Sequence, residues 1–324
     1  MTKGEILIIG GAGFIGSHVN KRLNEAGYST VVFDNLSRGN RSAVIKGTFI
    51  QGDLADRSAI KKILDEHNFD AVMHFAALTD VGESVANPLK YYRENVINTI
   101  HLLEELTVSR PCPLIFSSSA AVYGIPEYIP LNESHPCKPI NPYGETKKTM
   151  EDLLIDCGQS SKKFTFCALR YFNAAGGDPD GQIKIIRQTE NNLIPLVLKN
   201  LRNNTPKATL FGSNYDTPDG TCIRDYIHVM DLADAHLLAM EKLLNGSPSM
   251  IYNLGNGNGF SVLEVLNSIQ KVTKIPLDIT WGPRRAGDPP ILLADASKAR
   301  AALSWEPKYP ALDVMVKHAW KALT

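Results

Sequence analysis

A tyrosine and a lysine four residues apart have the side chains and spacing of a proton-transfer site. Tyr143 and Lys147 lie in the segment NPYGETKKTM, which begins with Asn-Pro and predicts the start of a helix. Two residues at this spacing share one helix face. To act as a base near neutrality, the pKa of tyrosine must fall from ~10 by roughly three units, or about 4 kcal/mol. A nearby ammonium lowers the pKa of the phenol in this direction.

A serine-rich segment supplies a third polar group. The segment FSSSAAVYG (116–124) reads as the end of a strand, and Ser119 is its last serine. A serine hydroxyl there can hold the reacting oxygen while the base takes its proton. Tyrosine and lysine pairs at this spacing are also frequent by chance. Ordinary helix surface is therefore the alternative for Tyr143 and Lys147.

A glycine-rich segment near the amino terminus predicts a nucleotide site. In GGAGFIG (10–16), Gly10, Gly13 and Gly16 fit GxxGxxG, and the same segment fits GxGxxG from Gly11. An apolar strand ends at the first glycine and a helix begins inside the motif. This arrangement gives a tight turn, a close approach of the backbone to a pyrophosphate, and a helix N-terminus that favours negative charge.

An acidic residue at the end of the next strand predicts which dinucleotide binds. Asp34 follows STVVF, at the spacing where a carboxylate accepts hydrogen bonds from ribose hydroxyls and repels a 2′-phosphate. NAD is therefore favoured over NADP. Arg38 and Arg41 lie close by and are able to pair with a phosphate, which leaves this preference open. Asp53 either caps the helix that follows it or hydrogen-bonds the adenine. A bound nicotinamide ring would also favour the phenolate of Tyr143.

These residues need a parallel sheet to bring them together. We expect strands at 5–10, 29–34, 70–77, 113–119 and 164–170, and helices at 13–26, about 56–66, 88–107 and after Pro142. The strands are continuous apolar runs, as in sheets covered on both faces. Alternating β and α units predict an α/β fold with a Rossmann-type, doubly wound parallel sheet.

The second half of the chain has shorter elements and more glycine and proline. It predicts a smaller mixed α/β C-terminal lobe that binds the substrate. We expect residues 1–172 to form the dinucleotide-binding domain, to which a later segment at about 221–245 returns. Residues 173–324 then form mainly the substrate lobe.

Composition excludes several classes of partner and site. The chain has 324 residues, with 34 basic and 34 acidic side chains and a formal net charge of zero. This balance predicts neither a nucleic-acid nor a membrane surface. The apolar run near the amino terminus is short for a signal peptide or a membrane span, so we expect a cytoplasmic protein. The five cysteines and eight histidines are scattered, and we expect no metal site.

Ordered blocks along nearly the whole chain carry a family resemblance. They are GGAGFIGSH, VVFDNLSRG, HFAALTDVGESVANPLKYY, FSSSAAVYG, NPYGETK, LRYFNAAG, NNLIP, GTCIRDYIHVMDLADAH, YNLGNGNGFSV and PRRAGD. The chain resembles the extended short-chain dehydrogenase/reductase family, and within it the UDP-glucose (UDP-galactose) 4-epimerases. So many blocks in order are far more specific than any one motif.

The resemblance implies a reaction and a role for each of three residues. Tyr143 would be the base, Lys147 would lower its pKa and bind the nicotinamide ribose, and Ser119 would orient the sugar hydroxyl. In such epimerases NAD stays bound through turnover. Hydride moves from the sugar to NAD, and the 4-keto sugar turns over in the site. Hydride then returns to the other face, which interconverts UDP-glucose and UDP-galactose without net redox change.

The resemblance also implies two sets of binding residues and a homodimer. The NAD set is Gly10, Gly13, Phe14, Ile15, Gly16, Asp34, Asn35, Asp53, Leu54, Phe75, Ala76, Ala77, Asn95, Ser117, Tyr143, Lys147 and Tyr171. The UDP-sugar set is Ser119, Tyr143, Asn173, Asn192, Leu193, Thr209, Phe211, Arg224, Arg285 and Asp288. In the second set, Arg224 and Arg285 would clamp the diphosphate, which suits the guanidinium fork. Dimerisation would use helices at 87–107 and 142–159.

Three positions depart from the family pattern, and the last of them, Leu292, leaves the substrate range open. Thr79 stands where the family often has a lysine near the cofactor, and the loop 178–191 carries Lys184 and Arg187 in place of acidic residues. Leu292 is intermediate in size between the bulky residue of hexose-restricted enzymes and the small residue of those that accept N-acetylhexosamines.

Other activities on the same fold are the alternatives. A UDP-N-acetylglucosamine or dual-specificity 4-epimerase, or a UDP-pentose or UDP-uronate 4-epimerase, would use the same three catalytic residues. A 4,6-dehydratase expects an acid pair where this chain has Ser119-Ala120-Ala121. A non-catalytic NAD-sensing regulator would be expected to lose Tyr143 or Lys147, and both are present.

Overall fold

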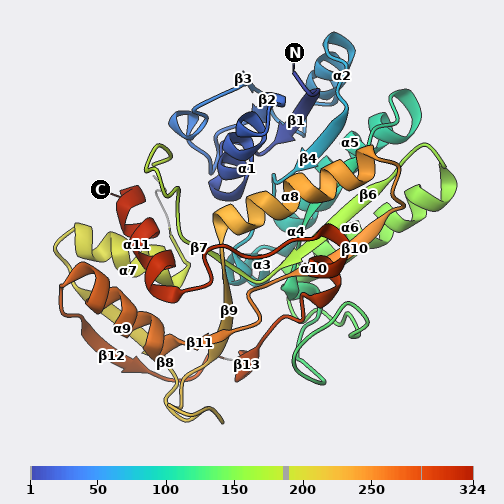
Figure 1. Ribbon diagram of the computed structural model, residues 1–324. Coiled ribbons are helices and arrows are strands. Elements are labelled where there is room, and N and C mark those ends of the chain that lie inside the picture. Colours follow the sequence, from blue (N-terminus) through green and yellow to red (C-terminus); the bar gives the residue numbers. More distant parts are fainter. Residues whose placement is uncertain (1, 185–189, 286, 324) are drawn as a thin grey trace. The chain divides into compact units, whose positions relative to one another are not determined.

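The structure is a computed structural model that describes residues 2–184, 190–285 and 287–323 (Figure 1). The chain forms two compact units, and neither is one continuous stretch. Unit 1 contains Met1–Gly124, Pro136–Arg170 and Ala233–Tyr252, and unit 2 contains Ile125–His135, Tyr171–Leu232 and Asn253–Thr324. The assignment of cofactor binding to residues 1–172 and of substrate binding to 173–324 stays a prediction.

Unit 1 is built on a seven-stranded sheet with the order β10-β6-β5-β4-β1-β2-β3. Its strands are β1 (Glu5–Ile9), β2 (Ser29–Asp34), β3 (Thr48–Gln51), β4 (Ala71–His74), β5 (Leu114–Ser119), β6 (Phe166–Tyr171) and β10 (Met250–Leu254). The pairs β1–β2, β2–β3, β1–β4 and β4–β5 are parallel. The predicted Rossmann-type α/β class is confirmed.

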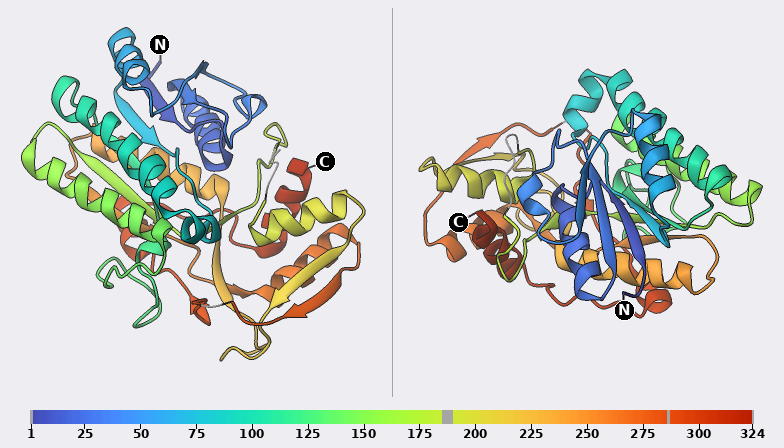
Figure 2. Two further views of the ribbon diagram at one scale, coloured as in Figure 1. Left: turned by 180° about the vertical axis from the view of Figure 1, so that it is seen from behind. Right: turned by 90° about the horizontal axis from the view of Figure 1, so that it is seen from above.

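Helices cover both faces of this sheet (Figure 2). Those of unit 1 are α1 (Phe14–Glu25), α2 (Arg57–Glu66), α3 (Val81–Ala86), α4 (Pro88–Tyr92), α5 (Asn98–Glu104), α6 (Pro142–Ser160) and most of α8 (Val229–Leu244). Because both faces are covered, Ile6, Leu7, Ile8 and Ile9 of β1 are all buried, at 2 % exposure or less. This double burial explains the continuous apolar runs in the sequence.

Two predicted elements differ from those observed. The helix expected at 88–107 is interrupted by π-helical turns at η2 (Arg93–Ile97) and η3 (Glu105–Ser109). The strand expected at 70–77 ends at His74, because only Ala71–His74 pair with β1. The next residue, Phe75, donates its N–H to the carbonyl of Ile9 and begins the loop beside the glycine turn.

Unit 2 is a mixed structure with two small sheets. Its strands are β7 (Asn173–Ala175), β8 (Lys207–Phe211), β9 (Ile223–His228), β11 (Gly259–Ser261), β12 (Asp278–Gly282) and β13 (Ile291–Leu292). Strand β9 pairs antiparallel with β11 and parallel with β7 and β13, while β8 and β12 form a parallel pair. The mixed α/β character expected of the C-terminal lobe is observed.

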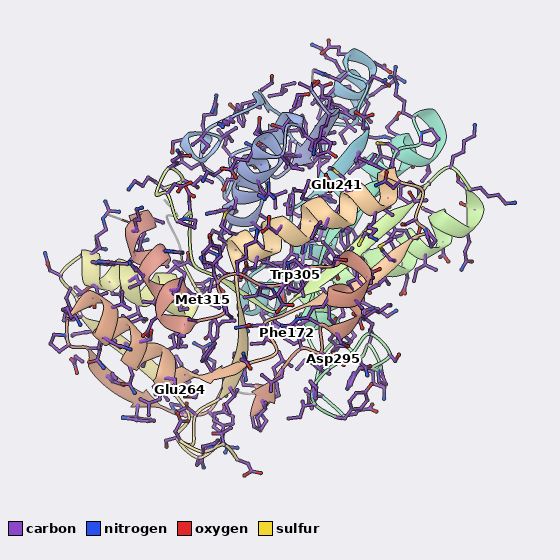
Figure 3. All side chains as sticks on the ribbon, in the orientation of Figure 1. Phe172, Glu241, Glu264, Asp295, Trp305 and Met315 are labelled. Atoms are coloured by element: carbon purple, nitrogen blue, oxygen red, sulfur yellow. The ribbon has the colours of Figure 1, made fainter. Side chains whose placement is uncertain are left out.

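Four helices complete unit 2, and three of them enclose its core. They are α7 (Leu193–Arg202), α9 (Val262–Thr273), α10 (Ser297–Leu303) and α11 (Leu312–Leu323). Helix α9 begins with a capping box between Ser261 and Glu264, and Met315 of α11 is fully buried in this core (Figure 3). In the described part of the chain, every helix is too short or too polar to span a bilayer.

Candidate active site

The glycine loop forms a backbone cradle at the carboxyl end of β1. Gly10 has a φ of +78°, and a Cβ built on it would lie 2.4 Å from the backbone nitrogen of Ala76. A Cβ on Gly16 would lie 2.4 Å from the carbonyl oxygen of Gly10. Only glycine is therefore compatible with either position. Helix α1 begins at Phe14, and its N-cap Gly13 offers no side chain to the first N–H groups. The N-terminus of such a helix favours a negatively charged group.

Two carboxylates lie at the ends of the strands beside this cradle. Asp34, at the end of β2, is buried and accepts hydrogen bonds from the N–H groups of Ala12 (2.9 Å) and Leu36 (2.8 Å). Burial raises the pKa of Asp34, and the two backbone hydrogen bonds oppose that rise. Asp53 accepts a hydrogen bond from the side-chain amide of Asn35 at 2.8 Å. Each carboxylate oxygen keeps acceptor capacity for a ribose or adenine donor.

The loop after β4 forms the other wall of the cradle. Phe75, Ala76 and Ala77 follow β4 directly, and Ala76 is the residue that excludes a side chain at Gly10. The side chain of Asn95 holds this loop, accepting from the N–H of Leu78 (2.8 Å) and donating to its carbonyl oxygen (3.0 Å). The N-terminus of α1, the close backbone packing that only glycine allows, and the two carboxylates together fit a dinucleotide.

Other predicted cofactor residues lie in the same unit or at its boundary. Ile15 is in the first turn of α1, and Leu54 is buried just after Asp53. Ser117 lies in β5, while Tyr171 is the last residue of β6 and begins the second segment of unit 2. Thr79 precedes Asp80, the N-cap of α3.

The predicted base lies at the start of α6. Asn141 caps this helix by accepting a hydrogen bond from the N–H of Gly144, and Pro142 occupies its first turn. A Cβ on Gly144 would lie 2.5 Å from the carbonyl oxygen of Ala121, so the first helical turn packs against the backbone that follows Ser119. The phenol of Tyr143, 9 % exposed, is hydrogen-bonded to the hydroxyl of Ser119. The structure thus brings Tyr143 and Ser119 together.

Lys147 lies one turn further along the same face of α6. Its Nζ donates to the carbonyl oxygen of Ser117 at 2.7 Å and lies 4.9 Å from the ring centroid of Phe116. Burial lowers the pKa of Lys147 to about 7, and the charge of Glu151 acts in the opposite direction. Burial raises the pKa of Tyr143, while its hydrogen bond with Ser119 lowers it. Lowering of the phenol pKa by Lys147 remains a prediction.

His74 faces this lysine from the end of β4. The imidazole is buried, and its Nε2 lies 2.9 Å from the hydroxyl of Thr99. Since the hydroxyl of Thr99 donates to the carbonyl of Asn95, it accepts from His74. Burial and the charge of Lys147 lower the pKa of His74 to about 3, so the ring is neutral. His74 is therefore a hydrogen-bonded core residue.

A buried ion pair behind Lys147 was missed by sequence reasoning. Arg170 of β6 binds the carboxylate of Glu151 through two nitrogens, with Nε–Oε1 at 2.9 Å and Nη2–Oε2 at 2.5 Å. The hydroxyl of Ser118 donates to the same carboxylate at 2.5 Å, and Arg170 donates to the phenol oxygen of Tyr123 at 3.0 Å. One signal was available, because Glu151 follows Lys147 at the same four-residue spacing.

The predicted diphosphate-binding arginines lie in unit 2. Arg224 of β9 donates to the carbonyl oxygen of Pro289 at 2.9 Å and pairs with Asp288 at 3.4 Å. The guanidinium of Arg285 stacks 4.1 Å from the ring centroid of Phe211. Phe211 ends β8, on the same strand as Thr209. The structure therefore brings together two pairs of predicted residues, Arg224 with Asp288 and Arg285 with Phe211.

A buried aspartate next to Arg224 was also missed. The carboxylate of Asp225 accepts from the N–H groups of Asn256 (2.7 Å), Gly257 (3.0 Å) and Ala294 (3.1 Å). Burial raises the pKa of Asp225 to about 6, and these hydrogen bonds oppose that rise. Its backbone carbonyl accepts from the side-chain amide of Asn173 at 3.1 Å. Asp225 thus fixes the strand that carries Arg224.

The remaining predicted residues of unit 2 flank these groups in sequence. Asn192 is the N-cap of α7, and Leu193 is its first residue. Leu292 lies in β13, opposite Arg224 in the register with β9. In the loop 178–191, Lys184 donates to the carbonyl of Lys321 at 3.4 Å.

Two further sequence predictions concern this region and the metal content. Arg187 of the same loop lies outside the described residues. Over residues 2–184, 190–285 and 287–323, no group of histidine, cysteine or acidic side chains is arranged to hold a metal ion.

Comparison with known proteins agrees with this geometry. The model of the NAD dependent epimerase/dehydratase family matches residues 6–255. The UDP-glucose 4-epimerase of Halalkalibacterium halodurans is 48 % identical, over 97 % of this chain and 94 % of the relative.

Two solved structures have the same fold. The NAD complex of UDP-glucose 4-epimerase from Brucella ovis superposes with a TM-score of 0.95 at 44 % identity, covering 98 % of this chain and 97 % of the other. The UDP-Glc/GlcNAc 4-epimerase of Campylobacter jejuni has a TM-score of 0.86 at 41 % identity and covers 98 % of both chains.

Proposed function

The chain belongs to the NAD dependent epimerase/dehydratase family, and from that premise we propose that it interconverts UDP-glucose and UDP-galactose. The observation that carries the proposal is the buried hydroxyl of Tyr143, hydrogen-bonded to Ser119, with Lys147 one helical turn away. This group lies in the same unit as the glycine cradle that follows β1.

The cofactor is NAD, and the residues of the cradle would hold it. The N–H groups at the start of α1 would bind the pyrophosphate, and Asp34 would accept hydrogen bonds from the ribose hydroxyls of the adenosine. Bound NAD supplies the acceptor and donor of hydride for C4 of the sugar. Asn35, Asp53 and Leu54 lie next along the chain after β2 and β3, on the adenosine side of this proposal.

Tyr143 takes the proton of the sugar 4-hydroxyl, and Ser119 holds the reacting oxygen by a hydrogen bond. Lys147 is fixed by the carbonyl of Ser117, so its ammonium keeps one position while the phenol changes charge. A cation in that position favours the phenolate and offsets the effect of burial on the pKa of Tyr143. After the sugar has turned, the same phenol returns the proton to the 4-oxygen.

The residues of unit 2 bind the UDP part of the substrate in this proposal. Arg224 and Arg285 neutralise the diphosphate, and Asp288 accepts from the uridine ribose. Phe211 lies against the uracil, and Thr209 lies on the same strand. Asn173, Asn192 and Leu193 complete the set. A guanidinium suits this task, because its planar fork binds two phosphate oxygens at once.

The test is to offer four UDP-sugars to the purified protein and measure the epimer formed from each. They are UDP-glucose, UDP-N-acetylglucosamine, UDP-xylose and UDP-glucuronate. We expect UDP-galactose from UDP-glucose, together with an absorbance band of reduced nicotinamide when UDP-sugar is added to protein with bound NAD. If UDP-glucose yields no UDP-galactose, the proposal is wrong. Epimer formation from one of the other three UDP-sugars would then identify the sugar that the enzyme accepts.

A homodimer and a cytoplasmic location complete the proposal. Exposed apolar side chains on the segment expected to dimerise support the first, since Leu89 is 77 % and Ile97 49 % exposed. The five free cysteines support the second, as thiols persist in reducing compartments. Light scattering of the purified protein measures the mass that tests the dimer.

A further inference from the structure

An ion pair joins the two loops that flank the glycine cradle. Arg38 lies after β2 and Glu83 lies in the first turn of α3 after β4, and Arg38 Nη2 is 3.0 Å from Glu83 Oε2. In the sheet order, β1 lies between β4 and β2, and all three strands run parallel. The loops that follow these three strands leave the same edge of the sheet. An ion pair between the loops after β4 and β2 therefore spans the glycine loop after β1.

The segment that carries Arg38 packs against the glycine cradle. The N–H of Asn40 donates to the carbonyl oxygen of Ala12 at 3.0 Å. A Cβ on Gly39 would lie 2.8 Å from the carbonyl carbon of Ala12. Asp34, just upstream, receives the N–H of Ala12. Arg38 therefore projects from a segment that is tied to the cradle at Ala12.

The segment that carries Glu83 is tied to the other side of the cradle. Ala76 lies so close to Gly10 that no side chain fits between them, and Asn95 holds Leu78 by two hydrogen bonds. Asp80 then caps α3 by accepting the N–H of Glu83 at 2.8 Å. The backbone of Glu83 is fixed by this cap.

The carboxylate of Glu83 is held in place by other donors. Lys90 Nζ lies 2.6 Å from Oε1, and the hydroxyl of Tyr91 lies 3.2 Å from Oε2. The hydrogen bond from Lys90 is the largest of the effects that lower the pKa of Glu83. The carboxylate of Glu83 is therefore charged at neutral pH, and it pairs with Arg38 from a fixed backbone position.

We propose that Arg38 and Glu83 form a clasp across the glycine cradle, which must open before a bound dinucleotide can leave. The clasp sets the rate of NAD release, and the inference rests on the proposed binding of NAD by this chain. It also assigns Arg38 a partner other than a 2′-phosphate, which is consistent with NAD as the cofactor. The side chain of Arg38 is half exposed, so salt weakens the clasp.

The experiment measures NAD dissociation from the purified holoenzyme by exchange against labelled NAD. Glu83→Gln and Arg38→Gln should each speed release by about two- to five-fold, as expected for an exposed ion pair. The double variant should release NAD no faster than the faster single variant, since either change opens the same clasp. High salt should speed release from the native protein and leave the double variant unchanged.

Arg57→Gln is the matched control, because Arg57 forms an exposed ion pair with Glu104 and belongs to neither of the two loops. Its NAD release should equal that of the native protein. Native rates in both single variants, or a double variant whose effect is the product of the singles, would overturn the clasp. If no NAD is retained by the native chain, the proposed function fails instead, so the two failures are distinguishable.

Discussion

The residues proposed for proton transfer in unit 1 and the arginine pairs proposed for diphosphate binding in unit 2 have different physical requirements. Tyr143 and Lys147 are 9 % and 3 % exposed, and the pair behind them, Glu151 and Arg170, is equally buried. In unit 2, Phe211 is 36 % exposed, and the side chain of Asp288 is 40 % exposed. Burial shifts pKa values, which proton transfer needs, whereas a group that clamps a diphosphate needs its full charge and access to the ligand.

The two regions also differ in how their charges are held. Arg170 is fixed by a carboxylate on two oxygens and by a phenol, inside a region of low dielectric. Arg285 stacks on one aromatic ring and is exposed to solvent. Substitutions in unit 1 should therefore change catalysis and stability together. Substitutions of the arginines proposed to clamp the diphosphate should change mainly substrate affinity.

The largest effect is expected from Tyr143→Phe. The ring remains while the phenolate oxygen proposed to accept the sugar proton is lost, so kcat should fall by about 10²- to 10⁴-fold. Steady-state epimerisation of UDP-glucose measures this fall. Tyr128→Phe removes the hydroxyl of an exposed tyrosine and serves as the control. A rate for Tyr143→Phe equal to that of this control would remove the phenol from the mechanism.

The next effect concerns stability. Arg170→Met leaves Glu151 charged and buried without its partner, which should lower the free energy of unfolding by about 3–5 kcal/mol. The paired replacement of Glu151 by Leu and Arg170 by Met removes both charges and should recover most of that loss. Urea unfolding of the three proteins measures both steps. Equal stability of the single variant and the native protein would show that Glu151 and Arg170 are more solvated than their low exposure indicates.

A pH-dependent effect is expected from Lys147→Met. Because burial lowers the pKa of Lys147 from 10.5 to about 7, the native protein pays for a buried charge below about pH 7. This cost fades as pH rises from the folded pKa toward the unfolded one. The stability of the variant relative to the native protein should thus be greatest at about pH 6. This stability difference between variant and native protein should decrease by about 3–4 kcal/mol between pH 6 and pH 10.

Thermal and urea unfolding at the two pH values, with NAD saturating, measure this change. Loss of the hydrogen bond to Ser117 shifts the stability of the variant by an amount independent of pH, so the trend stands apart from it. Lys148→Met, at the exposed neighbour that pairs with Asp152, should show no such trend. A flat difference for Lys147→Met would contradict the shifted pKa.

The smallest effect is expected from Arg285→Lys. The change keeps the charge but loses the planar fork and its stacking on Phe211, so KM for UDP-glucose should rise about tenfold with kcat nearly constant. Arg284→Lys is the control, as that arginine stacks on Tyr215 and bonds Asn214. A fall in kcat larger than the rise in KM would contradict the proposal that Arg285 acts mainly in substrate binding.

Local chemistry was readable from the sequence wherever it depends on neighbours along the chain. The glycine loop, the strand that precedes it and Asp34 predicted the dinucleotide cradle. Continuous apolar runs alternating with helices predicted the parallel sheet. The four-residue spacing of Tyr143 and Lys147 predicted a shared helix face. The substrate range, by contrast, depends on the sugar pocket and stays with the substrate test.

Contacts between distant segments were decided by the tertiary structure alone. Glu151 and Arg170 meet because α6 packs against β5 and β6, and Arg38 meets Glu83 because β1 lies between β2 and β4. The π-helical turns after Tyr92 and the interleaving of the two units have no local signal either. From the sequence alone, a charged side chain is expected at the solvated surface. Only the fold shows that it is buried with a partner of opposite charge. Partners far apart in the chain have no regular spacing by which the sequence would identify them.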